Sequence, residues 1–286
     1  MKKIFALLMI FSLVLMTGCG SGNSDGDKKS SGNEQIKLGI ICHLNVTETL
    51  LDNYFEKAAA RMPQTSGMYA PKHIFFDNMT SMVAALQSGQ IDALSTYYSV
   101  STYLLNRNSN LEIVTDRVPK VSDAFCCAML KENSALQKEF NEAIEKFTTD
   151  GTLKKLVETY ITDSTGDNSD DLPATSMPHF DGAQTVKVAV TGDLPPLDFV
   201  KADGNPAGFN TALLAAIATE LGKNFELVKI DSGARIMALT SKEVDVVFWV
   251  AVPQTDTLAP PDADTPEGVI LTTPYFSDEI VHVKIK

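Results

Sequence analysis

The sequence predicts an α/β fold built in two blocks, because short apolar strands alternate with amphipathic helices over most of its length. The first block runs from Ile36 to Thr162, and the alternation restarts at Val186. Strands that alternate with helices of this length indicate a mostly parallel sheet flanked by helices in each block. Residues 163–185 separate the blocks. They are rich in Asp, Ser, Thr, Pro and Gly, which is typical of an exposed linker.

Each element of the first block follows from a local pattern. A helix after Asn45 carries apolar residues on one face, and Gly89 ends the next helix. Asp150 and Gly151 break the last helical stretch in two. The expected strands lie at residues 36–41, 73–76 and 91–94. The expected helices are one with apolar residues between 50 and 58, one from residue 82 to Gly89, one around residues 100–105, and two within residues 134–161.

The second block repeats the β-α-β order. Gly222 ends its first helix, and a loop rich in Pro and Asp, residues 253–268, precedes the last strand. The expected strands lie at residues 186–190, 225–230, 244–248 and 279–285, and the expected helices at residues 213–217 and 234–239.

The two blocks share a local pattern of helix, tight turn and strand. It occurs at residues 82–92 and again at residues 236–245, ending at Asp92 and Asp245. A weak internal repeat of this kind predicts two similar lobes.

The N-terminus has the layout of a bacterial signal peptide. Lys2 and Lys3 precede an apolar run, residues 4–16, which is too short for a permanent membrane span. Thr17 and Gly18 then precede Cys19, which resembles the lipobox of lipoproteins. We expect residues 1–18 to be removed and Cys19 to carry a lipid anchor, the alternative being an ordinary cleaved signal with an incidental cysteine. Residues 19–35 form the tether, since residues 20–35 contain no apolar side chain.

The charge and the cysteines exclude several classes of function. A formal net charge of −12 argues against a nucleic-acid partner and against a basic membrane-binding face. Cys42 and the adjacent pair Cys126 and Cys127 lack metal-ligand spacing, so we expect neither a metal nor a cofactor. The sequence contains no HExxH or P-loop motif, so a non-enzymatic function is expected.

Five segments of the second block form a distinctive set: Val188–Leu197, Asp203–Gly204, Gly208–Asn210, Val244–Val247 and Thr273–Phe276. They resemble the first lobe of the family 3 extracellular solute-binding proteins, the receptors of ABC importers for polar amino acids. Leu86–Ala93 is similar to the second lobe, and Thr149–Leu153 to the C-terminal helices. The resemblance implies a two-lobed periplasmic-binding-protein fold in which two hinge segments connect the lobes.

The order of these motifs is unusual, because the first-lobe-like block comes second. A tandem array of damaged copies and a circular permutation both explain this order, and permutation is favoured because each motif occurs once. The resulting division is a lobe at 36–122, a hinge crossing with C-terminal-type helices at 123–162, the linker at 163–185, a lobe at 186–278 and a crossing strand at 279–286. The crossings themselves are expected near residues 124–130 and 279–285.

Ligands of open α/β sheets bind at the carboxyl ends of the strands, at helix N-termini. The resemblance implies an Arg clamp after residues 244–248 and an acid after Leu94, but Trp249 and Tyr97 follow these strands and no Arg lies between Lys242 and Lys284. We therefore expect an apolar, aromatic cleft. Its candidate residues are Asp193, Leu194, Leu197, Trp249, Val250, His43, Asn45, Tyr97 and Tyr98. Alternatively, Trp249 and Val250 are core residues and the cleft has lost its ligand.

The expected function is that of a lipid-anchored, extracytoplasmic receptor of an ABC importer, at the cell surface or in the periplasm. It would act as a monomer, bind an amino-acid-like or more apolar solute between its lobes, and deliver it to a membrane permease. His43 would be a wall residue of the cleft and not a metal ligand. The alternatives are a sensory or scaffold lipoprotein of the same fold and, less favoured, a dehydratase-like enzyme.

Overall fold

The computed structural model describes residues 36–41, 71–114, 121–163, 172–254 and 266–286. Residues 35–286 form one compact unit. The predictions for Cys19, Cys42, His43, Asn45 and the helix after Asn45 concern residues outside the described ranges.

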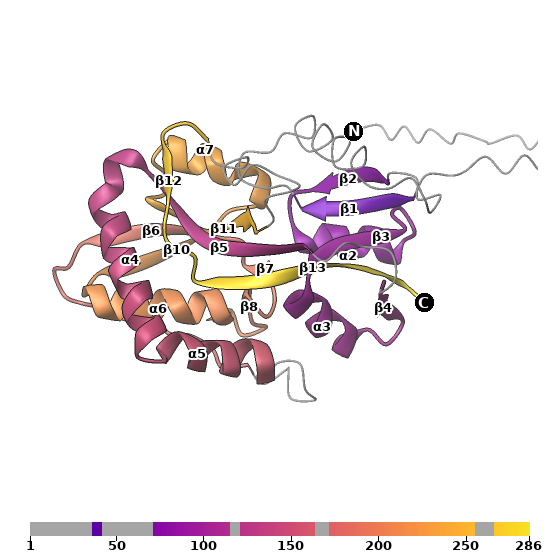
Figure 1. Cartoon of the computed structure of the whole chain (residues 1–286), viewed down its shortest axis with the longest axis horizontal. Coiled ribbons are helices and arrows are strands. Elements are labelled where there is room, and N and C mark those ends of the chain that lie inside the picture. The colour runs from indigo at the N-terminus through magenta and orange to yellow at the C-terminus, as the bar shows by residue number, and fades with distance from the viewer. Residues whose placement is uncertain (1–35, 42–70, 115–120, 164–171, 255–265) are drawn as a thin grey trace, which may run out of the picture. The chain divides into compact units, whose positions relative to one another are not determined.

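A single sheet of ten strands is the framework of this unit (Figure 1). Along its main path the strand order is β10-β6-β11-β5-β13-β3-β1-β2, while β12 pairs with β5 and β4 pairs with β13. The strands are β1 (Lys37–Ile41), β2 (Lys72–Phe76), β3 (Ala93–Tyr97), β4 (Leu111–Ile113), β5 (Val121–Leu130), β6 (Thr185–Val190), β10 (Asn224–Lys229), β11 (Val246–Pro253), β12 (Val269–Leu271) and β13 (Phe276–Ile285).

The direction of the strands divides the sheet into two lobes. Lobe 1, built on β1, β2 and β3, is parallel, and so is lobe 2, built on β6, β10 and β11. Between them β5 pairs antiparallel with β11 and with β13, and β13 pairs antiparallel with β3 (Figure 1). The predicted two-lobed α/β fold with two crossing strands is therefore confirmed.

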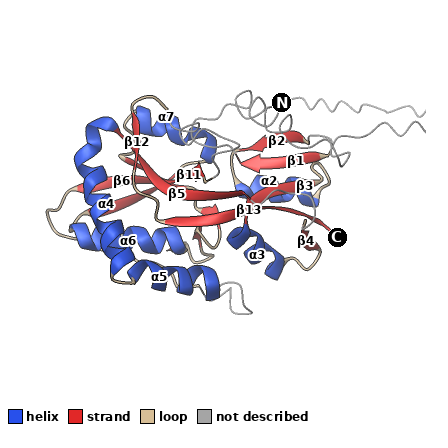
Figure 2. Cartoon of the chain, in the orientation of Figure 1, coloured by secondary structure: helices blue, strands red, loops and turns tan. Residues whose placement is uncertain are grey.

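Helices cover both lobes (Figure 2). They are α2 (Met79–Gln87) and α3 (Tyr98–Arg107) in lobe 1, then α4 (Ser134–Thr149), α5 (Thr152–Val157) with a π-helical turn (Glu158–Thr162), α6 (Phe209–Leu221) and α7 (Arg235–Thr240). Gly222 ends α6 in a left-handed conformation, φ 58°, where a residue without a Cβ fits best. A small sheet of β7 (Asp193–Leu194), β8 (Asp198–Val200) and β9 (Pro206–Ala207) was not predicted, because such short strands leave no periodic pattern.

Helix α4 packs on lobe 2 although it follows lobe 1 in the chain. The rings of Phe140 and Phe225 stack with their centroids 5.7 Å apart. Lys146 Nζ lies 2.6 Å from Glu220 Oε2 on α6, and Lys223 pairs with Glu139 of α4. These contacts fix the helix that follows β5 against the lobe that comes later in the sequence.

The internal repeat corresponds to the same structural device in each lobe. The Asp92 carboxylate accepts a hydrogen bond from the backbone N of Lys37 at 2.7 Å, and Asp92 N donates to Lys37 O. In lobe 2 the Asp245 carboxylate accepts from Lys187 N at 2.9 Å, and Asp245 N donates to Lys187 O. Each aspartate therefore ties the end of a helix–turn unit to the first strand of its lobe.

The segment between the two blocks is attached to lobe 2. Leu172 is buried, Ala174 forms a β-bridge to Ala207, and the Asn224 side chain bonds to Phe180 in both directions. The predicted exposed linker is thus held to the lobe along residues 172–184.

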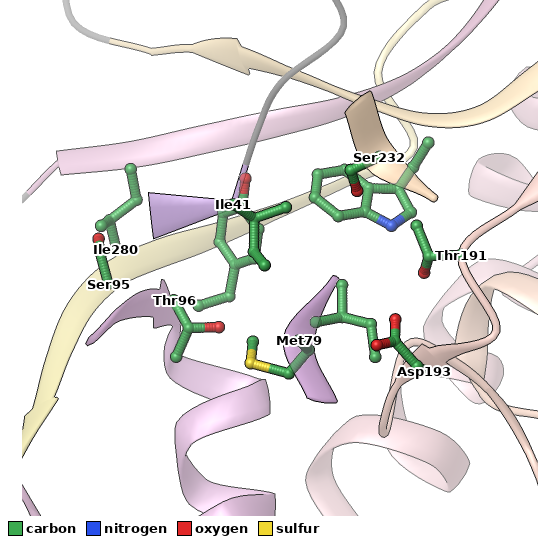
Figure 3. A pocket seen from close by; sticks show the side chains of 11 residues that line it. Ile41, Met79, Ser95, Thr96, Thr191, Asp193, Ser232 and Ile280 are labelled. Atoms are coloured by element: carbon green, nitrogen blue, oxygen red, sulfur yellow. The ribbon is translucent and has the colours of Figure 1, made fainter. Parts of the chain in front are cut away.

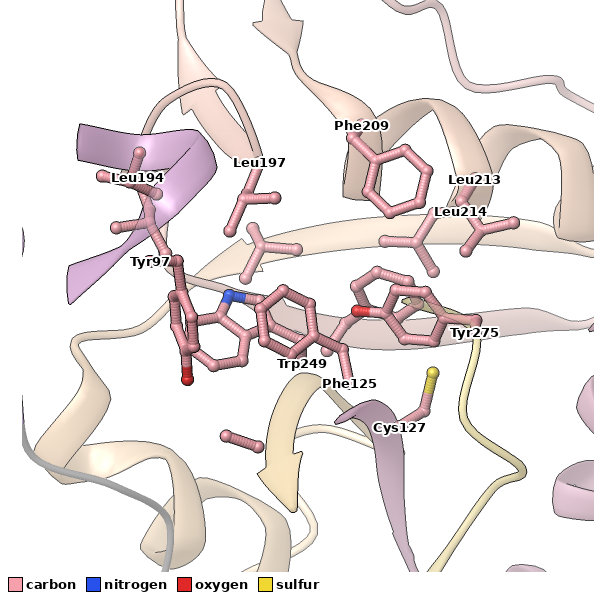
Figure 4. Packing of buried hydrophobic residues seen from close by; sticks show 14 of the residues in the cluster. Tyr97, Phe125, Cys127, Leu194, Leu197, Phe209, Leu213, Leu214, Trp249 and Tyr275 are labelled. Carbon is pink, nitrogen blue, oxygen red and sulfur yellow. The ribbon is translucent and has the colours of Figure 1, made fainter. Parts of the chain in front are cut away.

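The main hydrophobic core continues through the crossing strands. The Phe125 ring lies 4.7 Å from Tyr97, 4.8 Å from Trp249 and 6.4 Å from Tyr275, measured between centroids (Figure 4). Cys126 and Cys127 are buried and free in β5, and burial raises the pKa of Cys126 to about 11. Within the described ranges, no helix is both long and apolar enough for a membrane span.

Candidate functional site

A cavity of about 50 Å³ lies between the lobes, at the carboxyl ends of their parallel strands (Figure 3). Lobe 1 contributes Ile41, Met79, Ser95, Thr96 and Tyr97; lobe 2 contributes Thr191, Asp193, Leu194, Ser232 and Trp249; and Ile280 comes from the crossing strand β13. The location follows from the fold, because β1, β3 and β6 all end at this edge of the sheet.

The two lobes contact each other directly beside the cavity. Asp193 Oδ2 accepts hydrogen bonds from Thr80 N at 3.0 Å and from Thr80 Oγ1 at 3.2 Å. Thr80 lies in the first turn of α2, where the helix dipole favours a negative charge. Ser232 N also donates to Asp77 O at 2.8 Å. The described conformation is therefore a closed one.

The indole of Trp249 forms one wall of the cavity. It packs edge-on to Tyr97, with centroids 5.4 Å apart, and Arg235 lies 5.5 Å from its ring. Arg235 is itself buried and donates from Nη1 to the Trp249 carbonyl at 2.6 Å. The orientation of Trp249 is thus fixed by contacts on three sides.

Among the described residues that line the cavity, two buried polar atoms have no hydrogen-bond partner. They are Nε1 of Trp249 and Oγ1 of Thr96. A buried group without a partner costs about 1–3 kcal/mol. A solute that offers an acceptor to the indole N–H and a polar atom to the Thr96 hydroxyl would remove this cost.

Tyr97 presents its ring, and not its hydroxyl, for binding. Its Oη donates to Asp123 Oδ2 at 2.9 Å. Burial, and secondly the charge of Asp123, raise the pKa of Tyr97, so the hydroxyl remains protonated and bonded to that carboxylate. Asp278 lies opposite Asp123 across β5 and β13, and its Oδ2 accepts from Ser99 N at 3.2 Å, at the start of α3.

Of the predicted site residues, Asp193, Leu194, Tyr97 and Trp249 line the cavity. The other described candidates lie elsewhere.

Leu197 is fully buried in the core of lobe 2, where its N–H donates to Leu194 O. Val250 is also a core residue, because side chains alternate along a strand and Trp249 takes the cavity side. Tyr98 begins α3 and is 51% exposed. These three residues are not part of the cavity.

Sequence reasoning missed Thr191, Ser232 and Arg235. Thr96 begins a strand-end segment, Thr96–Ser99, that the sequence does place at the binding edge, although Thr96 is not among the candidate residues. Thr191 occurs where β6 ends, a position at which a hydroxyl could have been noticed. Arg235 was missed because we searched for a cation only after residue 242, whereas a long-range contact brings it from α7 to Trp249. Among the described residues, no group of three His, Cys, Asp or Glu is arranged to hold a metal ion.

The fold and the cavity define the class, a two-lobed α/β protein with a cavity between its lobes at the carboxyl ends of parallel strands. Residues 186–255 match the bacterial extracellular solute-binding proteins, family 3. This stretch runs from β6 to β11 and includes Thr191, Asp193, Leu194, Ser232 and Trp249 of the cavity. These 70 of the chain's 286 residues are similar to that family of solute-binding proteins.

Similar proteins include the ABC transporter glutamine-binding protein GlnH of Bacillus subtilis (strain 168), 30% identical over 86 residues, or 30% of this chain. The match covers 31% of that relative's length. Among solved structures, a ligand-binding component of an ABC-type import system from Staphylococcus aureus with zinc bound has a TM-score of 0.43 at 10% identity, covering 88% of this chain and 66% of that one. A nutrient-binding protein from Burkholderia cenocepacia bound to methionine has a TM-score of 0.40 at 14% identity, covering 87% and 84%.

Proposed function

We propose that the chain is the solute receptor of an ABC importer and closes its two lobes around a small solute. The observation that supports this function best is the cavity at the strand ends, lined from both lobes, with unpaired polar atoms on Trp249 and Thr96. Contacts between Asp193 and Thr80 form only when the lobes meet, so closure and binding would be coupled.

The walls of the cavity indicate the kind of solute. Ile41, Met79, Leu194, Ile280 and the rings of Tyr97 and Trp249 are apolar surfaces, which suits a solute with an apolar part and one or two polar groups. The volume of about 50 Å³ lies well below the roughly 300–1,000 Å³ of ordinary ligand sites. The lobes would therefore have to part to admit a solute and close on it less tightly than in the conformation described.

The test uses Trp249, the single tryptophan of the chain, as the reporter. Residues 35–286 are titrated with amino acids, amides, nucleobases, aromatic acids, small peptides and sugars while indole fluorescence and the melting temperature are recorded. A hit should weaken in Thr96→Val, which removes the unpaired hydroxyl, and persist in Thr219→Val, an exposed threonine on α6. Silence across the panel in both measurements would contradict the proposal.

We further propose that the lobe order results from circular permutation, with residues 36–122 as one lobe and residues 186–278 plus the helices of 134–161 as the other. The strand register supports this. Lys284 near the end of β13 pairs with Ala93, and Ala93 pairs with Leu38 of β1. Lys284 and Leu38 are therefore two strand spacings apart, about 10 Å. A short connection can bridge this distance between the end of β13 and the start of β1.

The N-terminal segment belongs to the same proposal. A lipid on Cys19 and removal of residues 1–18 would hold the receptor at the outer face of the membrane beside its permease, as a monomer. Mass spectrometry of the mature protein tests this, because the first residue should be Cys19 with an added diacylglyceryl group. Cys19→Ser should release the protein into the medium or the periplasm.

A sensory or scaffold role of the same fold is the second candidate. The observations that favour it are the small volume of the cavity and the direct hydrogen bonds that join the lobes, from Thr80 to Asp193 and from Ser232 to Asp77. In that case the titrations would be silent, and the closed unit would bind a membrane partner directly.

A further inference from the structure

The charges around the cavity restrict the solute beyond its size. Asp193 is the one charged side chain among the described residues that line the cavity. Two buried carboxylates lie behind the ring of Tyr97. Asp123 accepts a hydrogen bond from the Tyr97 hydroxyl, and Asp278 is its partner on the neighbouring strand. Arg235 lies outside the lining, where it binds the Trp249 carbonyl. Three carboxylates and one guanidinium, that of Arg235 against the Trp249 ring, therefore adjoin the described lining, which leaves an excess of negative charge.

The Asp193 carboxylate can accept further hydrogen bonds. Both of its hydrogen bonds, from Thr80 N and Thr80 Oγ1, reach the same oxygen, Oδ2. Within the described part of the chain, its Oδ1 accepts no hydrogen bond, although an ionised carboxylate offers about four lone-pair sites. Figure 3 shows the Asp193 carboxylate at the edge of the cavity with Thr191 nearby and Thr96 across from them. A donor on a solute can thus reach Asp193 without breaking the contact between the lobes.

The other polar groups of the cavity suit a solute that carries an uncharged hydrogen-bond acceptor. The Trp249 indole N–H donates and never accepts, and the Thr96 hydroxyl can do either. The rings of Trp249 and Tyr97 add favourable surface for a cation. A carboxylate, in contrast, would be buried beside Asp193 with no cation in the described lining, and a buried charge without a partner is strongly disfavoured.

We propose that the cavity selects a small amine with an uncharged acceptor, such as an amino amide or an amino alcohol, and rejects the corresponding amino acid. Asp193 is the specificity-determining residue: its Oδ1 takes the ammonium group while Oδ2 keeps the lobes together. This inference rests on the proposed solute-binding function and names the chemical class of the solute.

The experiment compares matched pairs that differ only in one group. Glycinamide, alaninamide and phenylalaninamide are titrated against glycine, alanine and phenylalanine at about pH 6, where the amines are protonated. Trp249 fluorescence and calorimetry measure binding to residues 35–286. We expect each amide to bind at least tenfold more tightly than its acid.

The variant Asp193→Asn separates selection by charge from a structural role. Asn keeps an oxygen that accepts from Thr80 but removes the charge, so the amide-over-acid ratio should fall at least tenfold. A residue that only holds the lobes together would weaken amides and acids alike. Asp181→Asn, which alters a fully exposed acid of lobe 2, is the control and should leave the ratio unchanged. The melting temperature verifies that both variants fold.

The outcomes distinguish this inference from the function on which it rests. Amino acids that bind as tightly as their amides, or an unchanged ratio in Asp193→Asn, would overturn the inference while supporting a solute receptor. The absence of any binding by these pairs and by the wider panel would overturn the receptor function itself.

Discussion

At the scale of single residues, burial controls how this protein responds to pH. Burial lowers the pKa of His282 on β13, and the charge of His73 lowers it further. Since the folded state then binds the proton less readily than the unfolded chain, stability is complete above the ordinary histidine pKa of 6.5 and falls as the pH drops through the folded pKa. We expect the free energy of unfolding to decrease below pH 6.5 by at most about 1.4 kcal/mol per pH unit from this residue.

Denaturant unfolding followed by Trp249 fluorescence between pH 5 and pH 8 measures this slope. In His282→Gln the free energy of unfolding should decrease less steeply with falling pH than in the wild type. In His179→Gln, which alters an exposed residue, the wild-type dependence should remain. A wild-type slope in His282→Gln would show that another group is responsible.

The contribution of Asp278 to the free energy of unfolding should change with pH in the opposite direction. Burial raises its pKa, so its contribution to stability is complete below the ordinary carboxyl value of 3.8 and is lost as the pH rises through the folded pKa. Asp278→Asn removes the buried charge and leaves an oxygen that can accept from Ser99 N. The variant should therefore gain stability relative to the wild type more at pH 7 than at pH 4, as measured by urea unfolding. An equal difference at both pH values would contradict this.

Residue roles of this kind mark the limit of sequence reasoning. The apolar periodicity around Phe140 and Leu213 predicts helices correctly, because it is a local property of the chain. In contrast, Asp278 accepts from the first turn of α3, which is 179 positions away, and no local pattern indicates that contact. Trp249 was predicted to line the cleft from its place in the sequence, whereas the contact of the Arg235 guanidinium with its ring was not predicted.

At the scale of elements, the repeated aspartate connects each helix–turn unit to the first strand of its lobe. Asp92→Ala and Asp245→Ala each remove a charge-assisted hydrogen bond to a backbone N–H, which we expect to cost about 1–2 kcal/mol in exposed or partly exposed positions. Because the two sites lie in different lobes and share no partner, the double variant should lose the sum of the single effects. Asp→Asn at either site keeps an acceptor and should cost less.

Chemical denaturation of the wild type, the two alanine variants, the double variant and the two asparagine variants provides the measurement. A double variant that loses much less than the sum would mean that the two aspartates do not act independently. The sequence indicated the repeat itself, since both copies have the same helix, turn and strand. It did not indicate the hydrogen bonds, because Lys37 and Lys187 lie far from these aspartates in the chain.

At the scale of the whole compact unit, the two lobes share one sheet, and their described residues also meet directly, for example where the Tyr97 and Trp249 rings pack 5.4 Å apart. Besides Asp193 with Thr80 and Ser232 with Asp77, the rings of Tyr103 on α3 and Phe199 on β8 lie 6.1 Å apart. These contacts lie where the surfaces of the two lobes meet. The lobes are also connected within the sheet, because β5 and β13 pair through their backbones with strands of both lobes. Opening can therefore break these contacts and leave the crossing strands paired.

The proposed permutation makes a prediction about chain order at this same scale. A rearranged chain that starts at residue 172, runs to residue 286, continues through a flexible linker of about eight residues and then covers residues 36–163 keeps every strand pair of the sheet. Such a linker spans the roughly 10 Å between the ends of β13 and β1, since an extended chain covers about 3.3 Å per residue. We expect the rearranged protein to fold with the circular dichroism of the original and to bind the same solutes. If it fails to fold although the linker is lengthened, the present order of the blocks is itself required for folding, and permutation from a family-like ancestor loses its physical support.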